Sequence, residues 1–230
     1  VTLLLLGLLY FADAVSSLQP PEFYPAGLVT AWGLMALLNK MNWNTEAMTF
    51  SLCLLIFVYF LAGLESERRR IAYATPKFLA PLYDTAHLLT LFVLARVGIN
   101  LLIEFIDIGE WTDTTQFWGA ADLITLAGSY ALFAWGRYQE RWAHVAAWLG
   151  FGGGGLIAIV YSRGHCSSAA IGAIIASLFI LAERGMNYLI SGAGVKRRMR
   201  ARARLVWILF RRPLLVTGWI ASAGTIGMAL

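Results

Sequence analysis

Residues 47–64 read AMTFSLCLLIFVYFLAGL, an apolar run that contains no charged side chain. A transmembrane α-helix needs about 20 such residues, with a range of roughly 17–25, to cross the hydrocarbon of a bilayer. Comparable apolar runs occupy residues 1–17, 24–39, 78–105, 117–136, 142–161, 168–190 and 213–230. The sequence therefore predicts an all-α, polytopic membrane helix bundle of about eight transmembrane helices, in a single integral membrane domain over 1–230. The alternative is seven spans, with one of the first two runs re-entrant.

Composition supports a membrane protein. The 230 residues are 59% hydrophobic and 13% charged, whereas soluble domains are about 45–50% apolar and roughly 25% charged. The net charge of +5 would suit a nucleic-acid binder only if it lay on a soluble face. Most of the excess lies in short loops between apolar runs, so we expect no nucleic acid among the partners.

Loop charges predict the topology. Basic residues are concentrated in loops 64–77, 137–141 and 191–212, whereas loop 105–116 is acidic and contains no cation. Basic loops remain on the cytoplasmic side of a membrane. We therefore expect these three loops to be cytoplasmic, and the membrane to be a bacterial inner membrane.

Residues 195–212 have a second feature besides their charge. Lys196, Arg197, Arg200, Arg204 and Arg211 gather on one side of a helical projection, with Trp207 at interfacial depth. This pattern predicts a basic amphipathic interfacial helix that contacts anionic lipid headgroups and ends at Pro213. The alternative is a plain loop whose arginines only orient membrane insertion.

Ionisable and polar residues within the apolar runs are costly and require a reason. They are Asp13, Asp84, His87, Arg96, Asn100, Glu104, Asp122, Glu183 and Arg184. The first interpretation is interhelical pairing, of Arg96 with Asp122 or Glu104 and of Arg184 with Asp84 or Asp13. The alternative is a proton or ion path through Asp84, His87, Arg96, Asp122 and Glu183.

The glycine run at 150–155 lies inside a predicted span. Gly150 and Gly154 have the small-xxx-small spacing that allows helices to approach closely, so we expect a packing role. A hinge or a lined cavity is the alternative. The three histidines lie at unmatched depths and no zinc-ligand spacing is present, so we predict no cofactor, although bound lipid is expected.

Residues 163–168, RGHCSS, place His165 beside Cys166. A neighbouring imidazole can lower the pKa of a thiol and produce a nucleophile. The Cys166–Ser167 pair at a helix start, with Arg184 further on, resembles membrane transpeptidases of the exosortase kind over these few residues. The resemblance implies a membrane thiol enzyme that uses Cys166, but the later histidine of that family has no counterpart in this sequence.

Three functions follow from these patterns. We expect a non-enzymatic membrane subunit that binds other membrane protein chains, because oppositely charged residues are available for pairing and no inverted repeat of the transporter kind is evident. The first alternative is a transporter or channel component, and the second is the thiol enzyme.

Overall fold

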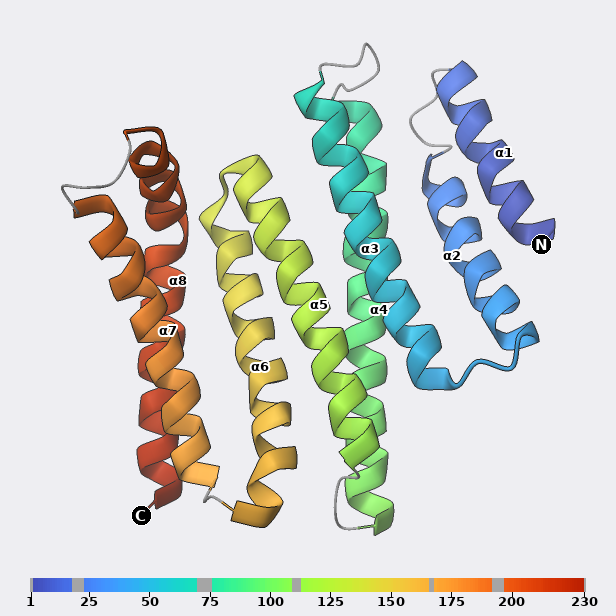
Figure 1. Ribbon diagram of the computed structural model, residues 1–230. Coiled ribbons are helices and arrows are strands. Elements are labelled where there is room, and N and C mark those ends of the chain that lie inside the picture. Colours follow the sequence, from blue (N-terminus) through green and yellow to red (C-terminus); the bar gives the residue numbers. More distant parts are fainter. Residues whose placement is uncertain are drawn as a thin grey trace. The chain divides into compact units, whose positions relative to one another are not determined.

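The computed structural model describes residues 2–17, 23–69, 76–108, 113–165, 168–191 and 197–229. These residues form helices only, and no strand occurs among them (Figure 1). The eight helices are α1 (Thr2–Ser17), α2 (Phe23–Lys40), α3 (Thr45–Arg68), α4 (Pro76–Ile108), α5 (Asp113–Arg137), α6 (Glu140–His165), α7 (Ser168–Ser191) and α8 (Arg197–Ala229).

Five segments of these helices are long and apolar enough to cross a membrane, judged by length and composition. They are Thr45–Arg68, Leu79–Glu104, Asp113–Arg137, Glu140–Ile159 and Arg204–Gly224. The predicted all-α membrane helix bundle is therefore confirmed, and the chain has the character of an integral membrane protein. The spans assigned to α1, α2 and α7 stay predictions.

The helices group into two compact units, Val1–Trp111 and Thr112–Leu230. In unit 1, α1 packs on α2, α3 packs on α4, and α2 also contacts both α3 and α4. In unit 2, α5 packs on α6, α7 packs on α8, and α6 also contacts both α7 and α8. A single domain over 1–230 stays a prediction.

The core of unit 1 is built on one face of α3. Leu52, Ile56, Tyr59 and Phe60 lie at positions i, i+4, i+7 and i+8, which places them on one side of a helix, and all are buried. The Tyr59 hydroxyl donates a hydrogen bond of 2.9 Å to the backbone oxygen of Gly27 in α2. This bond ties α3 to α2 in the interior of the unit.

Glycines allow the helices of unit 1 to approach closely. A Cβ at Gly33 in α2 would lie 2.8 Å from the backbone nitrogen of Leu4 in α1, and a Cβ at Gly27 would lie 2.8 Å from Cγ2 of Thr85 in α4. Real Cβ atoms do not tolerate such distances, so larger residues would force these helices apart. Small residues at contact points are typical of helix packing in membranes.

The core of unit 2 contains an aromatic cluster at one end. Ala134, Ala143 and Leu209, from α5, α6 and α8, form a buried cluster against which Trp142 packs. The ring of Trp142 lies 5.6 Å, between centroids, from that of Phe133. Residues from three helices therefore meet at this point and fix their relative positions.

The expected end of a helix at Pro213 is wrong. Helix α8 continues through Pro213 as one helix of 33 residues. Proline removes one backbone donor and usually kinks or ends a helix in water. In membrane proteins, packing against neighbouring helices compensates for that loss, and Pro213 is fully buried against the protein.

Candidate functional site

The first polar site lies in unit 1 and joins α2 to α4. The Tyr24 hydroxyl donates a hydrogen bond of 2.7 Å to the Asp84 carboxylate. Both residues are exposed, and Asp84 lies within the apolar segment Leu79–Glu104. Within unit 1, no ion pair joins Asp84 to a cation among the described residues. The neutral Tyr24 hydroxyl is the hydrogen-bond partner of this exposed carboxylate.

His87 lies one helical turn from Asp84, and the two residues occupy neighbouring positions on α4. The imidazole is half-buried, and its centroid lies 5.3 Å from that of the Phe60 ring in α3. Asp84 and His87 therefore place a carboxylate and an imidazole one helical turn apart on α4, and the ring contact of His87 is with Phe60 of α3.

The second polar site lies in unit 2 and joins α7 to α8. Nε of Arg211 lies 3.6 Å from a carboxylate oxygen of Glu183. The Glu183 side chain is 8% exposed, whereas that of Arg211 is 50% exposed. The guanidinium group also lies 4.6 Å from the ring centroid of Trp207, a cation–π arrangement. The buried carboxylate is therefore neutralised within its own unit.

The sequence identified Glu183 and Arg211 as notable residues, but not as a pair. The two are separated by the end of α7, a loop and the first turns of α8, so helical spacing contains no signal for their contact. The pairing depends on how α7 and α8 pack. The same is true of Tyr24, which sequence reasoning did not select.

The remaining intramembrane residues occupy different environments. Arg96, Asn100 and Glu104 are half-buried along α4, and Asp122 is buried in α5. Asp13 and Arg184 are exposed, in α1 and α7. The pairs expected from the sequence, Arg96 with Asp122 or Glu104 and Arg184 with Asp84 or Asp13, stay predictions.

The glycines of α6 face different neighbours. A Cβ at Gly150 would lie 3.8 Å from the Ala127 side chain in α5, and one at Gly154 would lie 3.7 Å from Ile175 in α7, both ordinary contacts. A Cβ at Gly153 would lie 2.8 Å from Ile124 and 3.1 Å from the Ala120 oxygen, both in α5. The closest approach is therefore at Gly153, which the spacing argument did not single out. The packing role of Gly150 and Gly154 stays a prediction.

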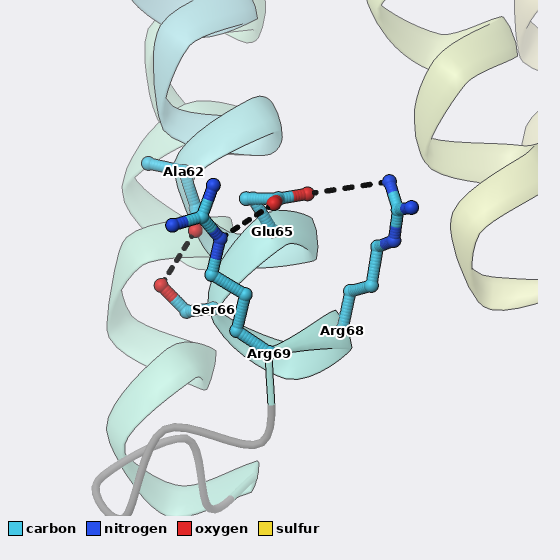
Figure 2. A network of polar contacts seen from close by, with 5 residues as sticks. All are labelled: Ala62, Glu65, Ser66, Arg68 and Arg69. Atoms are coloured by element: carbon cyan, nitrogen blue, oxygen red, sulfur yellow. Dashed lines mark hydrogen bonds and ion pairs between the residues drawn. The ribbon is translucent and has the colours of Figure 1, made fainter.

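The basic end of α3 contains a small ion-pair network (Figure 2). A carboxylate oxygen of Glu65 accepts a hydrogen bond of 2.7 Å from Nε of Arg69, and the other lies 3.7 Å from Arg68. The hydroxyl of Ser66 donates a hydrogen bond of 2.7 Å to the backbone oxygen of Ala62, one turn earlier. All three charged groups are solvent-accessible, so exposed pairing of this kind contributes little to stability.

The basic stretch before Pro213 is only partly described. Lys196 lies outside the described residues, and for Arg197 and Arg200 the structure describes the helical backbone alone. Arg204 and Arg211 are exposed, and Trp207 is half-buried. Their contact with lipid headgroups stays a prediction.

The cysteine site expected from the sequence falls outside the residues whose side chains the structure describes. Cys166 lies outside the described residues, and His165 is described by its backbone alone. The thiol of Cys53 in α3 is buried. Within the described part of the chain, no group of three or more His, Cys, Asp or Glu side chains could hold a metal ion.

Comparisons with known proteins find no matching family model, no matching curated protein and no matching solved structure. The apolar helices define the class of protein, a polytopic helical membrane protein.

Proposed function

We propose that this chain is a non-enzymatic integral membrane subunit, a scaffold or accessory component of a larger membrane complex. The Glu183–Arg211 pair is the observation that carries the proposal. A buried carboxylate with a cation 3.6 Å away in the same unit has the chemistry of a structural contact. The charge of this carboxylate is balanced inside its own unit, without a transported ion.

The exposed surface is consistent with binding to other membrane chains. Large apolar side chains are exposed along several helices; on α7 they include Ile174, Leu178, Leu181 and Tyr188. Lipid and apolar partner helices both accept such a face, and association within the membrane depends on packing and polar contacts. We further propose a bacterial inner membrane location, cytoplasmic basic loops, and anionic lipid at the basic end of α8.

Purification of the full chain in mild detergent tests the subunit proposal. We expect the 25.4 kDa chain to elute in a larger particle that contains other membrane chains in fixed stoichiometry. A chain that remains monomeric at every detergent concentration tested, while folded, would contradict the proposal.

Transport is the second candidate, and one observation favours it. Asp84 is exposed within an apolar segment, accepts a hydrogen bond from Tyr24, and lies one turn from His87. The residues proposed for a proton or ion path are Asp84, His87, Arg96, Asp122 and Glu183. Vesicles that contain the purified chain and an internal pH-sensitive dye distinguish the candidates. Proton movement that is lost in Asp84→Asn at normal folded yield would establish transport and reject the subunit proposal.

A further inference from the structure

Two ten-residue segments of the chain share a pattern. Residues 81–90 read PLYDTAHLLT, and residues 213–222 read PLLVTGWIAS. Proline, leucine and threonine recur at the first, second and fifth positions. Alanine or glycine stands at the sixth, leucine or isoleucine at the eighth, and threonine or serine at the tenth. The first segment belongs to α4 and the second to α8, the last helix of each unit.

The structure repeats the pattern in three dimensions. Both prolines lie inside a helix and are buried, as are Thr85 and Thr217. The hydroxyl of Thr90 donates a hydrogen bond of 2.8 Å to the backbone oxygen of Ala86. Ser222, at the equivalent position, donates a hydrogen bond of 2.9 Å to the backbone oxygen of Gly218. Thr85 donates to the Pro81 oxygen, a bond that Thr217 does not repeat among the described residues.

The helix before each segment matches as well, with an offset of 116 residues. Glu67–Arg68 near the end of α3 corresponds to Glu183–Arg184 in α7. With the same offset, Val29, Ala31 and Trp32 of α2 correspond to Val145, Ala147 and Trp148 of α6. The two tryptophans are both exposed and the two alanines both buried. The order of packing, given above for each unit, is also the same, apart from a contact of α5 with α8 that α1 and α4 do not repeat among the described residues.

At the contact between the third and fourth helices of each unit, a larger side chain on one helix is matched by a smaller one on the other. In unit 1, Gly63 of α3 lies against the Tyr83 ring of α4. The equivalent positions in unit 2 hold Phe179 in α7 and Leu215 in α8. A Cβ at Gly218, the counterpart of Ala86, would lie 3.4 Å from Phe179 and 3.1 Å from Ile180. In unit 1 the glycine at this contact is on the third helix, at Gly63, whereas in unit 2 it is on the fourth helix, at Gly218.

We propose that units 1 and 2 are copies of one four-helix unit, and that the Tyr24–Asp84 pair, which only the first copy has, is a contact site for a basic side chain of a partner membrane chain. The partner in this proposal rests on the proposed function. The duplication is independent of it.

The second copy acts as a natural control for the first. Val216 and Trp219 occupy the positions of Asp84 and His87, so the four-helix unit is built without a carboxylate or an imidazole there. The shared residues are therefore the scaffold, and Asp84 is an addition to it. An additional intramembrane carboxylate is retained where it has a functional partner.

The negative charge of the Asp84 carboxylate determines which side chain of a partner it binds. Asp84 is exposed, with apolar Leu28 and Leu88 also exposed one turn from Tyr24 and Asp84. The hydrogen bond from Tyr24 occupies one carboxylate oxygen, Oδ2. A lysine or arginine on a partner helix supplies the positive charge by binding the second carboxylate oxygen of Asp84. The apolar side chains around Asp84 favour a partner helix over a hydrated ion.

The duplication is tested by moving the size compensation into unit 1. We expect Gly63→Phe alone to reduce the folded yield of the full chain several-fold, because the ring collides with Tyr83. Adding Tyr83→Leu and Ala86→Gly reproduces the residues of unit 2 and should restore most of the yield. A triple variant that folds no better than Gly63→Phe would overturn the duplication.

The partner site is tested by photo-crosslinking from the full chain in its native membrane, with a benzophenone amino acid at Leu88. Its counterpart Ile220 in unit 2 is the matched control position. We expect the Leu88 probe to label a membrane-helix peptide that contains lysine or arginine, and Asp84→Val to abolish this labelling when it is measured per folded chain. Labelling from Ile220 should be unaffected by Asp84→Val.

Three outcomes would overturn the site. They are labelling of lipid only, labelling of this chain itself, and labelling that persists in Asp84→Val. If the chain still elutes in a larger particle in any of these cases, the subunit proposal stands and the Asp84 site alone is rejected. If the chain is monomeric as well, both proposals fail.

Discussion

Glu183 and Tyr59 are polar residues placed in the interior of their units, and each has a partner on a neighbouring helix. Their environments differ in charge. Glu183 is an ionisable group whose partner reaches it from a half-exposed position, whereas Tyr59 is neutral and donates to a backbone oxygen. Removing the Glu183–Arg211 pair and removing the Tyr59 hydrogen bond should therefore lower the stability of the chain by different amounts.

We expect Arg211→Leu to destabilise the chain, because it leaves the Glu183 carboxylate buried without its cation. Breaking a buried pair costs about 3–5 kcal/mol in soluble proteins. Arg211 is half-exposed and solvent screens part of the interaction, so we expect a smaller loss, about 1–3 kcal/mol. Thermal unfolding in detergent measures it. The neighbouring Arg212→Leu is the matched control, and equal losses from both variants would contradict the pairing.

We expect Tyr59→Phe to cost about 1 kcal/mol, the usual net contribution of one hydrogen bond. The substitution removes the donor and leaves the Gly27 oxygen with one acceptor site unfilled. Urea-induced unfolding in mixed micelles provides the comparison. Tyr10→Phe, at an exposed position of α1, should have no measurable effect. A loss for Tyr59→Phe no larger than for Tyr10→Phe would show that the bond does not contribute.

At the scale of helices, hydrophobic run length predicted most element positions. The run at 47–64 lies within α3, and the run at 117–136 lies within α5. The break expected at Pro213 was wrong, because local sequence contains no information on the packing that compensates for a proline. The same reason explains why Gly153 was missed: spacing identifies glycines that could face a neighbour, and only the packed helices show which one does.

We expect Gly153→Ala to destabilise unit 2, since its Cβ would lie 2.8 Å from Ile124 and 3.1 Å from a backbone oxygen of α5. Gly155→Ala is the matched control in the same helix, because nothing lies within 4 Å of its Cβ. Alanine favours a helix over glycine by about 0.5–1 kcal/mol, so the control should be neutral or slightly stabilising. Comparing their melting temperatures tests the close approach of α5 and α6. Equal effects would argue against it.

At the scale of the whole chain, composition alone was sufficient to predict a membrane helix bundle. The internal similarity was not recognised, although both ten-residue segments are visible in the sequence. The offset between the units changes from 116 to 132 residues, because α7 extends beyond the counterpart of the end of α3 and the basic first turns of α8 have no counterpart in α4. A search at one fixed period therefore does not align the two units, whereas matching burial and hydrogen bonds does.

Topology provides a prediction at the same scale. Single cysteines introduced at Thr114 and Arg200 should react with a membrane-impermeant thiol reagent from opposite sides, because the basic loops are expected in the cytoplasm and loop 105–116 outside. Both native cysteines are first replaced by serine. Labelling of the two positions from the same side would reject the predicted topology.

The continuity of α8 has a mechanical consequence. A helix of 33 residues is about 50 Å long at 1.5 Å per residue, and the hydrocarbon is about 30 Å thick. One continuous helix therefore connects the arginine-rich end at Arg197 to the apolar segment Arg204–Gly224 and does not end at Pro213. A sideways displacement of the basic end would tilt the whole helix about the buried region around Pro213. The far end would move in the opposite direction.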